Sequence, residues 1–346
     1  MEERETKLFS LVKKIHEEKF WEEYWDTDML AIQLPENEEP IFVSFLGKGE
    51  GNVGLLIYRN LKELAYLFET LAYADEWNSF RLLLLQSCLA VHYEDRETLT
   101  KEEYERVKAS GVTFRGRKAW PVFTSFQPRY YPKTPVEEEM EWLAEVLEKV
   151  LETAEDFRSK RHFYEDEDED FQFLLREYKA DGSMEDGLFD VPEEVLQGLS
   201  PDIIGRQPVL VSEFEMMRVK QVPWKQRVWE MDLDEVEVPV VLENEEEWAF
   251  FPSIWMVVDP VEHTILETDV VKEDEIEELQ RKLVQLFLSA HVRPSEMMVS
   301  SVKEPFITAY FWELLHELGI RLVVVEELPV IASIKERLDD LSSDES

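Results

Sequence analysis

The chain has 346 residues, with 77 Asp and Glu against 37 Lys and Arg, and a formal net charge of −40. Such an acidic surface repels nucleic acid and anionic lipid, so we expect no nucleic-acid partner and consider a basic protein or a small anionic ligand instead. Apolar residues make up 44% of the sequence, which excludes a disordered chain, and the length favours two domains.

Two features of the sequence concern the compartment. The single cysteine, Cys88, excludes a disulfide framework within the chain and indicates a reducing compartment. The charged N-terminus lacks the features of a signal peptide, and no uncharged apolar run approaches the ~18 residues of a membrane span. We therefore expect a cytoplasmic protein with no membrane segment, in which Cys88 is a buried apolar residue rather than a nucleophile.

Residues 1–160 mix helix and strand signals, which predicts an α+β domain. The chain opens with an amphipathic helix, and two apolar runs around a glycine-rich turn at 39–60 predict a β-hairpin. The turn GKGEG lacks the G-K-[ST] ending and the following helix that a phosphate loop requires. Next come a predicted helix at 60–74, a strand at 80–93, a helix at 100–111, a strand at 120–126 and a helix at 134–154.

Two of these helices carry start signals in the sequence. Thr100 and Glu103 have the spacing of a capping box, in which each side chain accepts a backbone N–H of the first turn. Thr134 and Glu137 repeat that spacing around Pro135, which suits the first helical position. We therefore predict Thr134 as the N-cap of the second of these helices.

Between these helices, residues 106–136 contain no Asp or Glu, although the rest of the chain is strongly acidic. Their cations alternate with aromatic residues. One interpretation is structural: the cations offset the charge of the neighbouring acidic helices, at about 0–1 kcal/mol for each exposed pair. The other is an anion or nucleotide site, because arginine and aromatic rings together stack on bases and bind phosphate. The candidate residues for that site are Arg115, Arg117, Lys118, Trp120, Arg129 and Tyr131.

A composition change follows residue 160. The run YEDEDED at 164–170 and a glycine- and proline-rich stretch predict an acidic linker over 161–207, with a short helix at 171–178. The acidic run is interpreted as a solvated connector, with a divalent-cation site as the alternative.

Residues 208–341 predict an α/β domain with a mixed sheet, followed by a frayed tail at 342–346. Residues 223–240 resemble an edge strand with outward acids, and 248–271 a hairpin. Two strand–helix pairs then imply parallel strands joined by right-handed crossovers. This order of elements is similar to that of a ribonuclease-H-like domain. The pairs are preceded by a helix at 272–291 and comprise a strand at 297–302, a helix at 304–319, a strand at 321–328 and a helix at 329–341.

The strand ends of this domain offer a second candidate site, because open α/β sheets bind ligands there. The residues concerned are Asp259, Ser300, Ser301, Lys303 and Glu326. A metal-dependent hydrolase or nuclease would use Asp259 with Glu326 or Glu327 as metal ligands, although the middle strand ends in serines where another acid would help. The six histidines are far apart and have no metal-ligand spacing, so we predict no His or Cys metal site and no particular cofactor.

The segment FRGRKAWPVFTSFQPRYYPKTPVEEEMEWLAEVLE resembles a pattern of uncharacterised bacterial proteins: an arginine, W-P-x-F, a turn with prolines and tyrosine, and an acidic helix start. The segment from HVRPSEMMVSSV to the final helix is similar to their second domain, with R-P, L-G-I and L-P. The resemblance implies a two-domain family built from domains of unknown function, and no reaction. Arg129 stands where the pattern has glycine, which affects the turn.

These observations predict an α+β domain followed by an α/β domain. The favoured function is a non-catalytic binding or adaptor protein with an anion or nucleotide site. The alternative is the metal-dependent hydrolase that uses carboxylates of the second domain.

Overall fold

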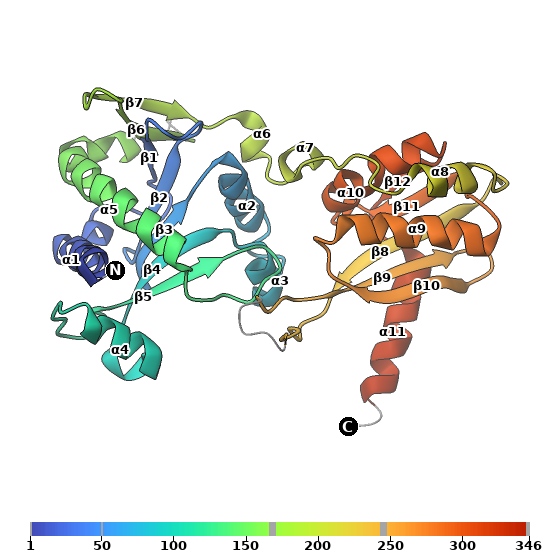
Figure 1. Cartoon of the computed structure of the whole chain (residues 1–346), viewed down its shortest axis with the longest axis horizontal. Helices are drawn as coiled ribbons and strands as arrows, with labels where there is room; N and C mark the ends of the chain where they lie inside the picture. Colours follow the sequence, from blue (N-terminus) through green and yellow to red (C-terminus); the bar gives the residue numbers. More distant parts are fainter. Residues whose placement is uncertain (1, 50, 166–170, 243–247, 344–346) are drawn as a thin grey trace. The chain divides into compact units, whose positions relative to one another are not determined.

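The computed structural model describes residues 2–49, 51–165, 171–242 and 248–343 (Figure 1). The chain divides into two compact units. The first comprises residues 1–128 and 132–198, and the second comprises residues 129–131 and 199–346. The acidic run at 164–170 and the tail at 342–346 fall largely outside the described residues.

The first unit is built on a seven-stranded sheet with the order β5-β4-β3-β2-β1-β6-β7. Neighbouring strands are antiparallel except β1 and β6, which are parallel. Its strands are β1 (Leu30–Gln33), β2 (Ile41–Leu46), β3 (Val53–Tyr58), β4 (Cys88–Glu94), β5 (Trp120–Phe126), β6 (Gln172–Tyr178) and β7 (Met184–Asp190). Its helices are α1 (Glu2–Glu18), α2 (Leu61–Ala72), α3 (Ser79–Leu84), α4 (Lys101–Ala109), α5 (Glu137–Phe157) and α6 (Glu193–Leu196), with short 3₁₀ turns η1 (Phe20–Glu22), η2 (Arg96–Thr98) and η3 (Arg158–Glu165).

The two faces of this sheet are covered differently. Because side chains alternate along a strand, Phe45 and Leu55 face one side and Ser44 and Leu56 the other. The first side packs against α1 and α5, whose apolar residues at helical spacing complete the main core. The second side faces α2, whose start is fixed by the side chain of Asn60 accepting a hydrogen bond from the backbone N–H of Glu63.

Most first-unit predictions are confirmed: the opening helix, the hairpin β2–β3, α2, α4 with its Thr100–Glu103 capping box, β5 and α5. Three were wrong in detail. The apolar run at 80–93 begins as α3 and only then becomes β4, because Asn78 caps a helix there. Helix α5 begins at Glu137, and Glu139 accepts from the backbone N–H of Val136, so Thr134 is not the cap.

The third correction concerns residues 171–178, which were predicted as a short helix within a linker. They form β6, whose partner β7 pairs with it from Gln172↔Asp190 to Tyr178↔Met184. Arg176 stabilises this pair from a nearly buried position, with its Nε 2.8 Å from Asp186 Oδ1. The hairpin therefore extends the first sheet, and the unit boundary falls near Gly198.

The second unit contains a five-stranded mixed sheet with the order β10-β9-β8-β11-β12. The hairpin β9–β10 and the parallel pair β11–β12 are confirmed. The ribonuclease-H-like order stays a prediction. The strands are β8 (Val228–Glu235), β9 (Ser253–Asp259), β10 (Thr264–Val271), β11 (Glu296–Ser300) and β12 (Arg321–Val325). The helices are α7 (Pro201–Ile204), α8 (Glu213–Lys220), α9 (Ile276–Ala290), α10 (Glu304–Glu317) and α11 (Pro329–Ser343).

Strand β8 was predicted at the edge with outward acids, and this was wrong. It lies in the centre of the sheet, between antiparallel β9 and parallel β11. One face carries Trp229, whose ring stacks on Phe287 of α9 at 5.8 Å. The opposite face carries Glu230, which accepts from the backbone N–H of Ile331 at 2.9 Å in the first turn of α11. Figure 1 shows α9 and α11 on opposite sides of this sheet.

None of the helices in the described ranges is both long enough and apolar enough to cross a membrane.

Candidate functional site

The six residues of the predicted anion site are divided between the two units. Arg115, Arg117, Lys118 and Trp120 belong to the first unit, whereas Arg129 and Tyr131 belong to the second. The side chain of Arg117 is 92% exposed and approaches only Asp95, at 3.3 Å. Lys118 donates from Nζ to the carbonyl of Gly51, at 2.7 Å. Trp120 packs against Phe114 in the apolar interior.

Arg129 and Tyr131 take part in contacts of the second unit. The backbone carbonyl of Arg129 accepts from Phe251, and the backbone N–H of Tyr131 donates to Ala249, each at a normal hydrogen-bond distance of 2.8 and 2.9 Å. Arg129 has a φ of 67°, in the left-handed region that favours glycine. This is the position at which the resembling pattern has glycine, so the side chain of Arg129 must offset a backbone penalty.

The predicted strand-end residues lie at opposite ends of the strands in the second sheet. We call the end at which the parallel strands finish the carboxyl edge. Ser300 pairs with Val325, and Glu326 follows directly, so Ser300, Ser301, Lys303 and Glu326 lie at the carboxyl edge of the parallel strands. Asp259 ends an antiparallel strand and therefore lies at the opposite edge, where Arg227 contacts it at 3.0 Å. The structure does not bring together Asp259 and Glu326, the two ligands that the hydrolase hypothesis required.

A buried group of charges occupies the carboxyl edge, and we call it the strand-end cluster. Arg129 Nη1 lies 2.6 Å from Glu273 Oε1, and Lys303 Nζ contacts the carboxylate of Glu235. Ser253 donates a hydrogen bond to the carboxylate of Glu273. The guanidinium of Arg129 also lies over the ring of Phe306. The members of the cluster are Arg129, Glu235, Ser253, Glu273 and Lys303.

Burial dominates the electrostatics of the strand-end cluster. The side chain of Glu273 is only 1% exposed, and its burial raises the carboxyl pKa in spite of Arg129 and Lys303. Burial likewise lowers the pKa of Lys303, although Glu235 opposes that shift. Two cations face two carboxylates, so the charges are matched within the cluster. Breaking such a pair leaves an uncompensated buried charge, and its first expected role is therefore structural.

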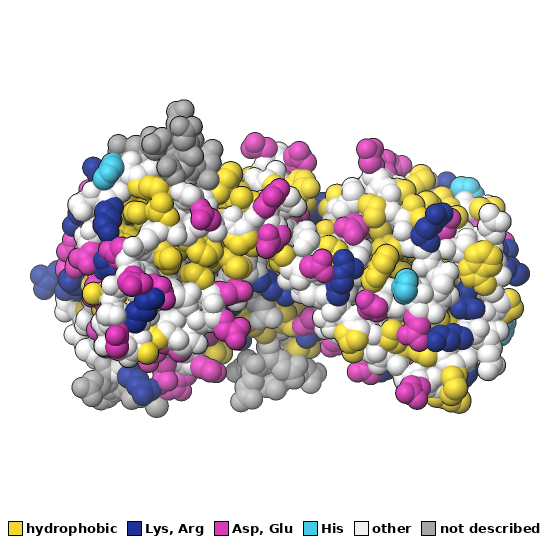
Figure 2. All heavy atoms as spheres, turned by 90° about the horizontal axis from the view of Figure 1, so that it is seen from above, with side chains coloured by type: hydrophobic (Ala, Val, Ile, Leu, Met, Phe, Trp, Pro, Cys, Tyr) yellow, Lys and Arg dark blue, Asp and Glu magenta, His cyan; other side chains and the backbone are white. Residues whose placement is uncertain are grey.

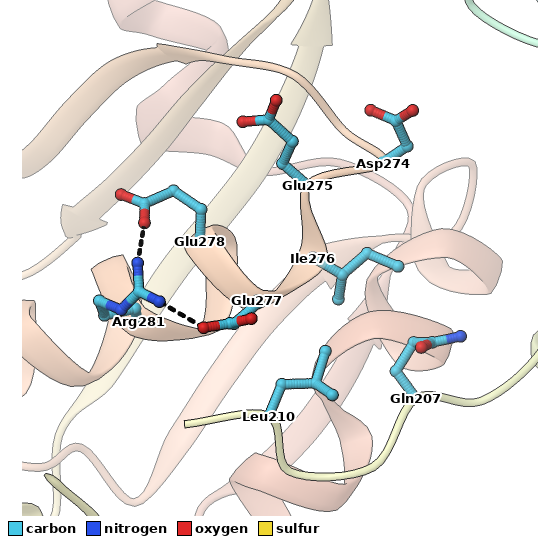
Figure 3. A pocket seen from close by; sticks show the side chains of 8 residues that line it. All are labelled: Gln207, Leu210, Asp274, Glu275, Ile276, Glu277, Glu278 and Arg281. Atoms are coloured by element: carbon cyan, nitrogen blue, oxygen red, sulfur yellow. Dashed lines mark hydrogen bonds and ion pairs between the residues drawn. The ribbon is translucent and has the colours of Figure 1, made fainter. Parts of the chain in front are cut away.

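An acidic hollow of about 440 Å³ lies at the start of α9 in the second unit. Figure 3 shows the carboxylates of Glu277 and Glu278 turned toward the guanidinium of Arg281, while those of Asp274 and Glu275 point elsewhere. Across the described residues, no group of three or more His, Cys, Asp and Glu side chains is arranged to hold a metal ion. The hollow is open, and its one cation is already engaged by two acids.

The first unit contains a larger and more apolar hollow, of about 650 Å³, between the second face of the sheet and α2. In this unit hydrophobic side chains gather on the face displayed in Figure 2 (yellow, left). Leu71 and Phe171 belong to the lining and are 51% and 52% exposed, which is unusual for large apolar side chains. The further apolar and aromatic lining consists of Met29, Leu46, Leu56, Tyr58, Leu67, Phe68, Ala72, Tyr164, Phe173 and Leu196.

A smaller hollow of about 340 Å³ adjoins the larger one, and four residues line both: Leu46, Leu56, Tyr58 and Leu67. His92 of β4 lines the smaller hollow, and its Nδ1 is buried without a hydrogen-bond partner among the described residues. Burial lowers the pKa of this imidazole, so the neutral ring is the form present near pH 7. An unsatisfied buried polar group costs about 1–3 kcal/mol, so Nδ1 is poised to gain from a partner.

Cys88 lies on the same strand, four residues before His92, and also lines the smaller hollow. It is buried, and burial raises the pKa of its thiol, which agrees with the expected apolar role. Four residues along a strand span about 13 Å, so the two side chains are too far apart to act as a nucleophile–base pair.

Sequence reasoning missed these hollows, and it placed the acids of β8 on an outward face although Glu230 and Asp232 are buried. The alternation W-E-M-D-L-D in residues 229–234 was a usable signal for the latter, because it separates an apolar face from an acidic one. The hollows have no comparable signal. Their lining comes from five strands, from α2, α6 and η3, and from the segments that connect them, and no local pattern shows that these elements leave space between them.

Comparison with known proteins gives two matches. Residues 6–176 match a domain of unknown function, DUF7309, and residues 215–339 match another domain of unknown function, DUF6930. The chain fits a two-domain uncharacterised family. No curated protein matches the chain. The two matched segments correspond to the α+β and α/β units, so the expected two-domain organisation is confirmed, while neither match brings a function with it.

Proposed function

We propose that the protein is a non-catalytic binding protein whose first unit holds a small, mostly apolar molecule in the larger hollow. We place it in the cytoplasm, on the grounds of its single cysteine and the composition of its sequence. The observation that carries the proposal is the hollow of about 650 Å³ on the second face of the seven-stranded sheet, whose lining is mostly apolar.

The size and the lining both suit a small ligand. Ligand pockets typically measure about 300–1,000 Å³ and combine mostly apolar walls with a few polar groups. Here Phe68, Phe171 and Phe173 supply aromatic wall, and Ser44 is already satisfied by its bond to the carbonyl of Asp26 at 2.6 Å. Each 100 Å² of apolar ligand surface removed from water contributes about 2.5 kcal/mol before the costs of association.

The cations of residues 106–136 support an anion site less well than the larger hollow supports an apolar ligand. Four of the six candidates belong to the first unit and two to the second, and Arg129 is committed to Glu273. The larger hollow carries only acids among its charged lining residues, Asp26 and Asp28. For these reasons we replace the small anion of the sequence-based hypothesis with an apolar ligand.

Biphenyl, an uncharged apolar probe, tests the proposal by thermal unfolding. A ligand at ten times its Kd stabilises the folded state by about 1.4 kcal/mol, which raises Tm. Leu67→Trp places a larger side chain on α2 in the space shared by both hollows and should remove most of the shift. Leu188→Trp is the matched control, because Leu188 on β7 is exposed and does not belong to the lining.

Saturable stabilisation of the parent protein and of Leu188→Trp, but not of Leu67→Trp, would support the proposal. Equal shifts in all three proteins would show that biphenyl binds elsewhere. The absence of a shift with biphenyl and with larger uncharged hydrocarbons would remove the hollow as a ligand site.

A further inference from the structure

We infer that the ligand of the first unit is an uncharged amphiphile, with an apolar body in the larger hollow and a hydroxyl-type end hydrogen-bonded to His92 in the smaller one. This inference rests on the proposed function and names the class of molecule bound. Its basis is the unpartnered imidazole nitrogen of His92, a residue of the smaller hollow, together with the lining that this hollow shares with the larger one.

The smaller hollow adds uncharged hydrogen-bonding side chains to the apolar walls that it shares with the larger one. Its residues away from the shared part come from the turn before β3, from α2, from the segment before β4, and from strands β4 and β5. The polar members of that set, apart from His92, are Asn52, Thr70, Gln86 and Ser87. A molecule that fills both hollows therefore meets aromatic and aliphatic walls along its body and hydrogen-bonding groups at one end.

His92 is the best-defined contact for that end. It pairs with Gly54 of β3 and Val122 of β5 on the same sheet face. The backbone is close here, since a Cβ on Gly54 would stand 2.3 Å from the carbonyl oxygen of Val91, so this position requires glycine. The consequence is a fixed strand position for His92. Its Nδ1 has no partner among the described residues and is itself covered, so the ring has to rotate for a ligand hydroxyl to reach this atom.

Nδ1 of His92 is better matched by a hydroxyl than by a group that can only donate or only accept a hydrogen bond. A neutral imidazole presents one N–H and one bare nitrogen, and the tautomer decides which of them Nδ1 is. A hydroxyl can donate to a bare Nδ1 and accept from a protonated one, so it satisfies either tautomer. Because Tyr58 lines both hollows and lies four residues from Gly54, a ligand that reaches from the level of Tyr58 to His92 spans about 13 Å.

The charges around the hollows argue for an uncharged ligand. No Lys, Arg, Asp or Glu is part of the described lining of the smaller hollow. An ionised end group would lose its hydration there without gaining a counter-ion, which is far more costly than desolvating a hydroxyl. Carboxylates of Asp26 and Asp28 in the larger hollow further disfavour an anion.

Three biphenyl probes of similar shape test the inference: biphenyl, 4-hydroxybiphenyl and 4-biphenylcarboxylate. The affinity of each is measured by calorimetry for the whole protein and for His92→Phe, His92→Gln and Tyr104→Phe. We expect the parent protein to prefer 4-hydroxybiphenyl over biphenyl by about three- to tenfold, the range of one neutral hydrogen bond. The ratio should fall to about one in His92→Phe and be partly retained in His92→Gln. Tyr104→Phe, a change on α4 outside both linings, should leave the ratio unchanged.

The outcomes separate this inference from the function on which it rests. If all probes bind but the hydroxyl gives no advantage, or the advantage persists in His92→Phe, the inference is overturned while the larger hollow remains a binding site. Tightest binding by the carboxylate also overturns it, because the ligand class would then be anionic. If neither uncharged probe binds while Tm of each variant shows a folded protein, both the inference and the proposed function fail.

Discussion

The two units differ in what their sheets bury: the second unit buries paired charges, and the first leaves hollows lined mostly by uncharged side chains. In the second unit, the central strand β8 and the carboxyl edge carry buried charges, and each cation of the strand-end cluster faces a carboxylate. In the first unit, the face toward α2 carries few charges, leaves two adjoining hollows and holds an imidazole nitrogen that has no partner within the described ranges. Matched charges suit a structural role, whereas space beside an unsatisfied polar group suits a ligand.

This contrast reverses the emphasis that sequence analysis placed on the charged residues. The cations of residues 106–136 suggested a binding site. In the structure, the largely buried Arg129 is paired with Glu273, and the side chain of Arg117 is exposed to solvent. The more informative residues are uncharged or neutral ones that the fold leaves without a partner. Substitutions that remove one charge of a buried pair in the second unit should therefore have very different consequences from substitutions that fill a hollow or replace His92 in the first unit.

The largest effect is expected from breaking the strand-end cluster. Arg129→Met leaves the buried carboxylate of Glu273 without its cation, and loss of one partner of a buried pair costs about 3–5 kcal/mol. Chemical denaturation of the whole protein, followed by fluorescence, should show this loss in the transition of the second unit. The first unit should keep its own transition.

Two further variants decide whether pairing is the cause. Arg117→Met removes an arginine whose side chain is 92% exposed, and we expect a change within about 0.5 kcal/mol. The double variant Arg129→Met with Glu273→Met should recover part of the loss, because no charge is then left unpaired. A cluster that tolerates Arg129→Met as well as Arg117→Met would mean that its charges are solvated, and the contrast between the units would disappear.

A smaller effect is expected at the start of α11. Glu230→Gln keeps the shape of the side chain but replaces the carboxylate that accepts from the N–H groups of Val330 and Ile331. Since a negative charge is favoured at a helix N-terminus, we expect the free energy of unfolding to fall by about 1–2 kcal/mol. Glu336→Gln, on the exposed side of the same helix, is the control and should change it by less than about 0.5 kcal/mol. An equal response of the two variants would contradict the capping role.

The sequence was sufficient where a pattern is local. Alternation and turn residues located the hairpins β2–β3 and β9–β10, the capping box located α4, and strand–helix repeats gave the parallel pair β11–β12. It failed where the outcome depends on distant partners. Residues 172–178 form a strand because β1 and β7 pair with them. Strand β8 is central because β11, which follows α9 in the chain, pairs with its second side.

The candidate sites follow the same rule. Ser300, Lys303 and Glu326 were placed at one edge because the ends of parallel strands must meet there. The pairing of Arg129 with Glu273 joins residues 144 positions apart, and nothing in either local segment identifies the other. The hollows are harder still, since empty space arises from the way in which whole elements pack and is recorded in no single stretch of sequence.

The smallest predicted effect is a pH dependence that reports directly on His92. Burial lowers the pKa of its imidazole in the folded protein, against a minor opposing influence of Glu94, while the unfolded chain has the ordinary value of about 6.5. Below pH 6.5 the unfolded state therefore binds the proton more readily, and the free energy of unfolding falls as pH decreases toward the folded pKa. The slope from this one group cannot exceed about 1.4 kcal/mol per pH unit.

The measurement is the difference in unfolding free energy between the parent protein and His92→Phe at pH 7.5 and at pH 5.5, with His162→Phe, which replaces an exposed histidine, as the control. Relative to the parent protein, His92→Phe should become more favourable at the lower pH, because it has no buried ring to protonate, while His162→Phe should show no such gain. A His92→Phe difference that is the same at both pH values would place the imidazole in contact with water, and a hydrated ring has no unmet need for a ligand hydroxyl.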